Sequence, residues 1–369
     1  MLIYHQRNRD LRKFNMQRRQ FLQFSSAASI VSVGNFSARA DAIDWKTFVV
    51  TTTLNIQDAD RPVRVWLPLP NSIDGYQQVL DTRWSGTANN VQIYRDLQYD
   101  APMLYAEWSK PGPRELVATS QAKTLDRDNK PVVDPRADVP GHPPNVRRFL
   151  QPTKHIPTDG IVLSIAQEVT QADMNATEKA RAIYDWIVDN SFRDPKVRGC
   201  GRGDIKGMLE TGNLGGKCAD INSLFVGLCR AVGVAARENF GIRVGPSRNF
   251  KSLGKVGDIT GAQHCRAEFY THGAGWVPVD PADVRKVVLE ERLELQDTAV
   301  QKIRESLFGS WEMNWVEFNH ARDFILNPVS AITPINFLMY PHAEVAGTPR
   351  DELDAKSFVY QIEAKEITS

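Results

Sequence analysis

The pattern of apolar and polar positions divides the sequence into a β-rich first part and a mixed second part. Runs of β-branched and aromatic residues alternate with turn residues from position 44 to about 125, and they show no helical period. The runs lie at residues 48–54, 63–67, 91–94, 103–108 and 115–123. Short runs of this kind are typical of strands, and several in succession favour a sandwich. We therefore predict a small β-sandwich domain over residues 41–125.

Helical periodicity appears only after a segment that is rich in proline and charge. Residues 126–154 contain many prolines, a composition typical of a linker or of an extended strap along the surface. Apolar residues then recur at helical spacing after Asp159 as far as Thr170, and again from Asn175 or Thr177. Further helical patterns lie at residues 205–209, 218–232 and 284–295.

A glycine-rich loop delivers Cys218 to the start of one of these helices. Gly215 and Gly216 let the backbone bend sharply and allow close approach of a substrate. At the start of a helix, unpaired N–H groups and the helix dipole favour an anion, so the thiol ionises more easily than a free cysteine. A thiolate is a nucleophile. The alternative is a small buried cysteine that serves only in packing.

Two β-prone runs downstream, joined by a short link that contains glycine, predict an antiparallel hairpin. The first run carries His264 and the second ends at Asp280. If the hairpin turns at His272, positions whose numbers add up to 544 face one another, which places His264 opposite Asp280. An aspartate beside a histidine fixes its tautomer and stabilises the imidazolium. The sequence thus offers a nucleophile, a base and an orienting acid.

These residues carry a resemblance to a known family. The chain resembles the transglutaminase-like superfamily in Gly216-x-Cys218 at the start of an apolar helix, in His264 with Glu268 four residues later, in Gly275-Trp276, and in Asp280-Pro281. The resemblance covers roughly residues 155–290. It implies a papain-like thiol fold with Cys218, His264 and Asp280 on the three catalytic positions. One position departs from the pattern, because Arg266 stands where the superfamily often has an aromatic residue.

The expected fold class is therefore α+β. A papain-like transglutaminase core, with helices packed on an antiparallel sheet, occupies residues 155–369 after the β-sandwich and the linker of residues 126–154. β-prone runs at residues 315–326, 337–340 and 358–364 are expected to complete the sheet that carries His264.

The first forty residues differ from the rest of the chain. Gln17-Arg18-Arg19-Gln20-Phe21-Leu22 precedes a weakly apolar stretch and Ala38-Arg39-Ala40, a pattern typical of a twin-arginine signal with its cleavage site. We predict that residues 1–40 form this signal and that the mature protein is periplasmic or extracellular. A disordered basic tail is the alternative interpretation.

Removal of residues 1–40 changes the charge balance. It leaves 38 basic and 43 acidic residues, a net charge of −5. A nucleic-acid surface needs a basic stripe, so we do not expect a nucleic-acid partner. Runs of about 18 apolar residues are absent, so no transmembrane segment is expected after signal removal. The sequence does not indicate an oligomeric state.

We expect no metal and no cofactor. The isolated histidines have no Cys or His neighbours at ligand spacing. His264 and Cys265 cannot both face one ion from a regular strand. The sequence contains neither a phosphate loop nor a dinucleotide fingerprint.

The other cysteines have different interpretations. Cys229 lies on the buried face of the helix and Cys265 lies beside the histidine, so both are expected to pack in the core. Cys200 is either an ordinary loop cysteine, the favoured interpretation, or a partner of Cys218 in an oxidative lock.

A thiolate and an imidazole together attack an acyl carbon and form a thioester. The expected activity is cleavage of peptide or amide bonds in a protein or peptide substrate. Transfer of the acyl group to an amine, and a non-catalytic binding or scaffold role on the same fold, are the alternatives. The backbone N–H of Cys218 and the side chain of Gln263 are candidate donors to the oxyanion.

Overall fold

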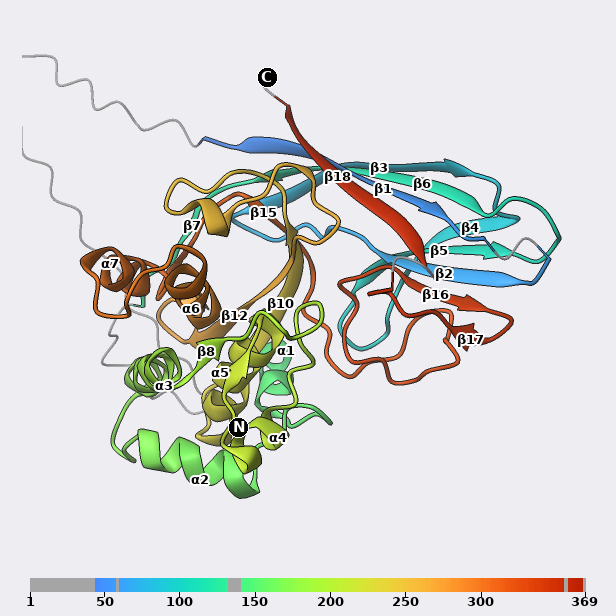
Figure 1. Ribbon diagram of the computed structural model, residues 1–369. Coiled ribbons are helices and arrows are strands. Elements are labelled where there is room, and N and C mark those ends of the chain that lie inside the picture. Colours follow the sequence, from blue (N-terminus) through green and yellow to red (C-terminus); the bar gives the residue numbers. More distant parts are fainter. Residues whose placement is uncertain (1–43, 58–59, 132–140, 355–357, 368–369) are drawn as a thin grey trace, which may run out of the picture. The chain divides into compact units, whose positions relative to one another are not determined.

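Figure 1 shows the computed structural model, which describes residues 44–57, 60–131, 141–354 and 358–367. The chain divides into two compact units, Met1–Ala42 and Ile43–Ser369, and the second contains every described residue. The predicted signal over residues 1–40 lies outside the described residues and stays a prediction.

Two five-stranded antiparallel sheets form the β-rich part of the fold, with the orders β11-β18-β1-β6-β3 and β17-β16-β2-β5-β4. Their strands are β1 (Lys46–Asn55), β2 (Val63–Pro68), β3 (Gln77–Gly86), β4 (Asn90–Arg95), β5 (Pro102–Trp108), β6 (Glu115–Thr124), β11 (Gly257–Asp258), β16 (His342–Val345), β17 (Thr348–Pro349) and β18 (Val359–Ile367). Leu54 and Leu116 of one sheet pack with Val65 and Trp108 of the other in a common core. The expected β-sandwich is thus present.

The sequence pattern predicted six of these strands, namely β1, β2, β4, β5, β6 and β18, and missed β3 and the short strands β11, β16 and β17. Nearly all of the side chains of β3 are exposed or half-buried, and only Gln77 at its start is buried. A strand with so little buried surface does not show the alternation of apolar and polar residues on which a sequence-based prediction depends.

The end of the described chain joins the sandwich. β18 pairs with β1 in a register that runs from Thr47↔Ile367 to Asn55↔Val359, as Figure 1 shows for the red strand beside the blue one. The expectation that residues 358–364 complete the sheet of His264 is therefore wrong, and residues 337–340 form no strand. A β-prone run indicates a strand, but its partner is chosen by packing between segments that lie far apart in the sequence. The predicted domain boundaries stay a prediction.

A four-stranded antiparallel sheet with the order β13-β12-β10-β15 carries the second part of the fold. Its strands are β10 (Ala236–Arg243), β12 (Gln263–Thr271), β13 (Gly275–Val279) and β15 (Trp315–Asn319). Residues 315–319 thus join the sheet of His264 as expected, but the rest of the expected run 315–326 does not continue the strand. The helix α5 (Cys218–Ala231) packs on this sheet, where Phe225 contacts Phe269 at a ring-centroid distance of 6.2 Å. The α+β fold class is confirmed.

The predicted helices are present, although the one expected over residues 284–295 is found at Pro281–Glu290, and those at Pro144–Arg147 and Thr298–Ser306 were not predicted. The helices besides α5 are α1 (Pro144–Arg147), α2 (Gly160–Val169), α3 (Ala176–Asn190), α4 (Ile205–Thr211), α6 (Pro281–Glu290) and α7 (Thr298–Ser306). α3 begins with a capping box, in which the Asn175 side chain accepts from the Glu178 N–H and the Glu178 carboxylate accepts from the Asn175 N–H. In the described part of the chain, no helix combines the length and the apolar character that crossing a membrane would require.

The described part of the predicted linker lies along the core. β7 (Arg127–Asp128) pairs with β14 (Ser310–Trp311). The Asn129 side chain donates to the carbonyl oxygens of Ala274 and Trp276 at 2.8 and 2.9 Å. These contacts correspond to the extended strap that was one of the two interpretations of this segment.

Candidate active site

Cys218 is the first residue of α5, and the carboxylate of Asp220 holds the chain around it. Asp220 Oδ2 accepts from the Lys217 N–H at 3.0 Å, which caps the start of the helix. Its Oδ1 accepts from the N–H groups of Arg202 and Gly203 at 2.9 and 2.8 Å. One buried side chain therefore ties the loop before α4 to the first turn of α5.

Glycines in the two loops make this arrangement possible. A Cβ atom at Gly216 would lie 2.4 Å from the Cβ of Asp220. Gly201 has a φ of +89°, and a Cβ atom there would lie 1.9 Å from Asp220 Oδ2. The same loop carries Cys200, whose carbonyl oxygen accepts from the Ala219 N–H at 2.9 Å. The glycine loop thus places a second thiol beside the first.

The thiol of Cys218 is 3% exposed and interacts with three side chains. Burial alone would raise the pKa of this thiol. Hydrogen bonds with Cys200, Cys265 and His264, together with the charge of His264, outweigh burial and lower the pKa well below its ordinary value. The hydrogen bond with Cys218, followed by burial, raises the pKa of Cys200. The local environment thus favours a thiolate on Cys218 and a protonated thiol on Cys200.

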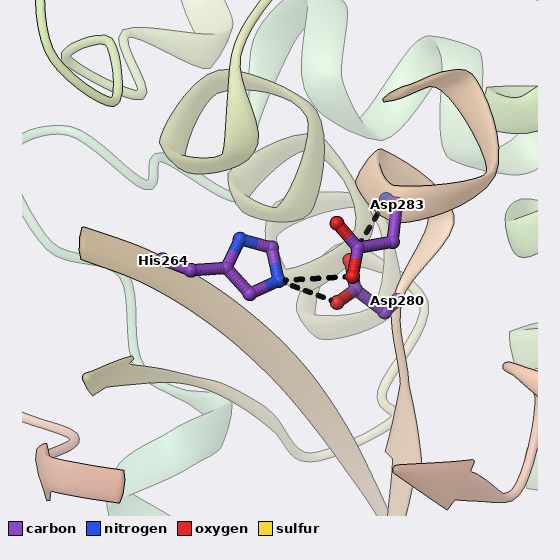
Figure 2. A group of neighbouring side chains, drawn as sticks. All are labelled: His264, Asp280 and Asp283. Atoms are coloured by element: carbon purple, nitrogen blue, oxygen red, sulfur yellow. Dashed lines mark hydrogen bonds and ion pairs between the residues drawn. The ribbon is translucent and has the colours of Figure 1, made fainter. Parts of the chain in front are cut away.

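His264 lies on β12, and its Nε2 is 2.7 Å from Asp280 Oδ2 (Figure 2). The predicted contact is present, but the predicted hairpin register is wrong. The strands pair Ala267 with Val279 and Thr271 with Gly275, so facing numbers add up to 546. Asp280 lies just beyond the last paired residue, as the N-cap of α6. The turn is centred one residue later than predicted, so each residue faces a partner two positions further along. A shift of two positions leaves every side chain on the face predicted for it.

A second carboxylate, that of Asp283, lies 3.5 Å from the same imidazole nitrogen (Figure 2). Asp283 also accepts two hydrogen bonds from Nη2 of Arg243, at 2.5 and 2.8 Å. Burial lowers the pKa of His264 and so does Arg243, but Asp283 and Asp280 outweigh both, and the pKa is raised. Since both carboxylates face Nε2, the other ring nitrogen, Nδ1, is the one free to exchange a proton with the thiol.

Asn222 positions Asp280 from the side of the helix. Its Nδ2 donates to Asp280 Oδ1 at 3.2 Å and to the carbonyl oxygen of Cys265 at 2.8 Å. Asp280 Oδ1 accepts in addition from the Asp283 N–H at 3.1 Å. Burial, followed by the charge of Asp283, raises the pKa of Asp280, and His264 lowers it. The orienting carboxylate is therefore fixed on three sides.

Arg266 occupies the position where the sequence departs from the superfamily. Its guanidinium carbon lies 4.7 Å from the ring centre of Trp315 and 5.3 Å from that of Trp311. Its Nε lies 3.7 Å from Asp280 Oδ2. Burial lowers its pKa to about 10. The side chain thus stacks among aromatic rings and faces the orienting aspartate.

Sequence analysis did not identify Asn222, Arg243 or Asp283. Asn222 follows Cys218 by one helical turn, and Asp283 follows Asp280 by three residues, so spacing offered a signal for both. Arg243 gave no such signal, because its role depends on the pairing of β10 with β12.

A cavity of about 520 Å³ opens at this cluster. Its lining includes Cys218, His264, Cys200 and Gln263. Gln263 is 7% exposed, and its Nε2 is buried without a hydrogen-bond partner. An amide group without a hydrogen-bond partner therefore belongs to a residue of the same cavity lining.

The candidate site also has the spacing of a cation site. His264, Asp280 and Asp283 each offer one ligand atom, and these atoms lie within 4.8 Å of one another. The guanidinium groups of Arg243 and Arg266 already face the two carboxylates. Because these cations balance the negative charge, we assign no metal to the cluster.

Comparison with known proteins identifies the family and the fold of the chain. A model of the Transglutaminase-like superfamily matches residues 163–281, which contain Cys218, His264 and Asp280. An uncharacterized protein of Haemophilus influenzae is 41% identical over 321 residues, covering 82% of this chain and 86% of its own. A solved structure from Cytophaga hutchinsonii, described as a "Putative Cysteine Protease", has a TM-score of 0.55 at 15% identity and covers 88% of this chain and 92% of its own. The chain belongs to the transglutaminase-like superfamily.

Proposed function

We propose that the protein is an exported cysteine enzyme that cleaves peptide or amide bonds through a thioester on Cys218. One observation carries the proposal: the Cys218 thiol contacts an imidazole whose far nitrogen is bound to Asp280 at 2.7 Å. A nucleophile, a base and an orienting acid in this order are the constellation of a thiol acyl-transfer enzyme. The description of the Cytophaga hutchinsonii protein as a cysteine protease agrees in kind.

In the proposed reaction, the Cys218 thiolate attacks the acyl carbon, and the C–N bond of the substrate breaks as the thioester forms. His264 gives a proton from Nδ1 to the leaving amine. His264 then takes a proton from water, and the resulting hydroxide attacks the thioester. The C–S bond breaks, which releases the acid and restores the Cys218 thiolate and the His264 imidazolium. Asp280 holds the ring and stabilises the imidazolium through both steps.

Two donors are available for the oxyanion. In the described part of the chain, the backbone N–H of Cys218 has no hydrogen-bond partner. The Gln263 Nε2 is also buried without a partner. Donors of this kind stabilise a developing oxyanion when they lie about 3 Å from it. We propose that these two groups form the oxyanion site.

The first test is alkylation of Cys218 with iodoacetamide at about pH 6, where an ordinary thiol of pKa about 8.5 is almost wholly protonated. We expect fast and selective labelling of Cys218 in the wild type and a loss of at least about tenfold in His264→Ala, because one pKa unit changes the thiolate fraction tenfold. Cys229→Ala, a buried change on the same helix, is the control. Slow labelling that is equal in all three proteins would favour a binding or scaffold role.

The second test separates hydrolysis from transfer. Wild-type protein and Cys218→Ala are incubated with a peptide library that includes glutamine-containing peptides, with and without a labelled primary amine. We expect cleaved peptides from the wild type alone. An amine adduct without cleavage would identify an acyltransferase and would contradict the proposed hydrolysis.

A further inference from the structure

The cavity at Cys218 contains more basic than acidic side chains. The basic residues in its lining, apart from His264, are Arg193, Lys217, Arg243, Lys255 and Lys286, and the acidic residues are Asp258 and Glu352. An excess of one sign in a concave site concentrates ligands of the opposite sign. Which of these charges remain available depends on their partners within the protein.

Three of the basic groups are wholly or partly neutralised. Arg243 forms the buried pair with Asp283 and serves the candidate triad. Arg193 and Lys286 share one carboxylate, that of Glu290, with nitrogen to oxygen distances of 3.4 and 3.8 Å. Two positive charges therefore face one negative charge, and Glu290 is itself 39% exposed. A positive charge remains at this side of the cavity.

Among the residues that the structure describes, no carboxylate lies within 4 Å of the amino group of Lys217 or Lys255. Neither side chain forms a salt bridge or a hydrogen bond within the described ranges of the chain. Lys217 directly precedes the nucleophile in the sequence, and Lys255 lies in the loop before β11. Both amino groups are thus available to a ligand.

The two acidic groups of the lining do not cancel this excess. Asp258 is exposed, and its carboxylate accepts hydrogen bonds from the N–H and the hydroxyl of Thr260 at 2.9 and 2.7 Å. Burial raises the pKa of Glu352, and the charge of Asp351 adds to this effect. Arg193, Lys217 and Lys255 are then the basic groups of the lining that remain for a ligand, since Arg243 pairs with Asp283 and Lys286 shares Glu290 with Arg193.

We propose that the cavity binds a substrate with a carboxylate close to the bond that is cleaved, and that Arg193, Lys217 and Lys255 recognise this carboxylate. This inference rests on the proposed function, since it names the class of substrate for the same site. Arg193 suits the role because a guanidinium can bind a carboxylate through two hydrogen bonds. The carboxylate comes either from an acidic side chain or from a free peptide C-terminus.

The test compares two alkylating agents of similar size on Cys218. Iodoacetate carries a carboxylate and iodoacetamide does not. We expect the ratio of the iodoacetate rate constant to the iodoacetamide rate constant to be about threefold to tenfold higher at Cys218 than in N-acetylcysteine amide at low salt. This is the effect of charges several ångströms away in a partly hydrated site. High salt should reduce this excess.

The variants are Arg193→Gln, Lys217→Gln and Lys255→Gln, singly and combined. Lys302→Gln on α7 is the matched control, because Lys302 is an exposed lysine outside the cavity. We expect the triple variant to bring the ratio to that of N-acetylcysteine amide, and the control to keep the wild-type ratio. A wild-type ratio in the triple variant would overturn the inference.

The same measurement separates this inference from the proposed function. If iodoacetamide does not label Cys218 selectively, the proposed function fails. If iodoacetamide labels Cys218 selectively and iodoacetate has no advantage, only the carboxylate inference fails.

Peptide pairs then identify the source of the carboxylate. One pair differs by Glu against Gln, and the other by a free against an amidated C-terminus. We expect the two peptides of one pair to differ in KM by at least about threefold, the smallest effect expected of such charges. The triple variant should abolish that difference. Equal KM values within both pairs would contradict the proposal.

Discussion

Arg243 donates two hydrogen bonds to Asp283, and both side chains are at most 4% exposed. Burial raises the pKa of Asp283, but Arg243 and His264 outweigh burial and lower it. Asp283 therefore remains ionised, 3.5 Å from the imidazole of His264. The candidate triad thus works beside a fourth charged group, which adds to the effect of Asp280 on the imidazole.

Replacement of Asp283 by Asn should lower the pKa of His264, since the charge of Asp283 raises it. In the wild type, the raised pKa means that protonated His264 stabilises the folded state. This stabilisation is complete below the pKa of the unfolded state, about 6.5, and is lost as the pH rises through the pKa of the folded state. In Asp283→Asn that loss should occur at lower pH. NMR titration of labelled histidine in a Cys218→Ala background measures the shift.

The control for this titration is Asp297→Asn, a change at the start of α7. Asp283→Asn also leaves Arg243 buried without its partner, which should cost about 3–5 kcal/mol of unfolding free energy. An unchanged His264 titration in a folded Asp283→Asn protein would contradict the role given to this carboxylate.

Cys200 should tune the reactivity of Cys218. Its hydrogen bond is the largest of the influences that lower the pKa of the Cys218 thiol. Cys200→Ala removes the donor, so the pKa of Cys218 should rise and the alkylation rate at about pH 6 should fall by about tenfold for one pKa unit. Cys200→Ser keeps a donor and should retain more of the rate. Equal rates in the two variants would show that the hydrogen bond is unimportant.

Gly201 should be intolerant of any side chain. A Cβ atom at Gly201 would lie 1.9 Å from Asp220 Oδ2, whereas one at Gly212 would have no atom within 4 Å. Both glycines have positive φ values, +89° and +67°. Gly212→Ala should therefore cost only about 1–2 kcal/mol from backbone conformation. Gly201→Ala should cost more and also slow alkylation of Cys218, as thermal unfolding and labelling would show.

Asn222→Ala should weaken the hold on Asp280. The change removes donors to the Asp280 carboxylate and to the Cys265 carbonyl oxygen, and a buried group left unsatisfied costs about 1–3 kcal/mol. We expect a lower kcat with a nearly unchanged KM, since Asn222 is not part of the cavity lining. Asn190→Ala, an exposed change on α3, is the control. A rise in KM alone would place Asn222 in substrate binding instead.

The sequence pattern pointed to three residues of the candidate site, Cys218, His264 and Asp280, but not to their exact placement or to their partners. Cys218, His264 and Asp280 each follow a local signal: a helix start, a strand, and the end of a second strand. The predicted hairpin was displaced by one position in its turn, yet His264 and Asp280 still meet, because Asp280 leaves the strand and caps a helix. A register error of this kind does not abolish the predicted contact when the two side chains remain on one face.

The remaining contacts of the site depend on packing that no local pattern encodes. Arg243 reaches Asp283 only because β10 lies beside β12 and α6 begins where β13 ends. The position of β18 shows the same limit on a larger scale. Its alternating residues predict a strand, but nothing in them distinguishes β1 from the sheet of His264 as the partner.

The position of β18 has a consequence for the order in which the candidate site is assembled. Phe358 and Tyr360 line the cavity at Cys218, together with Leu353, and the strand that carries Tyr360 is held in place by β1 near the start of the described chain. The ribosome makes these residues after all three members of the triad. A nascent chain that has reached Asp280 thus has its thiol, imidazole and carboxylate but lacks one wall of the cleft, which delays assembly of the complete site until translation has passed Tyr360.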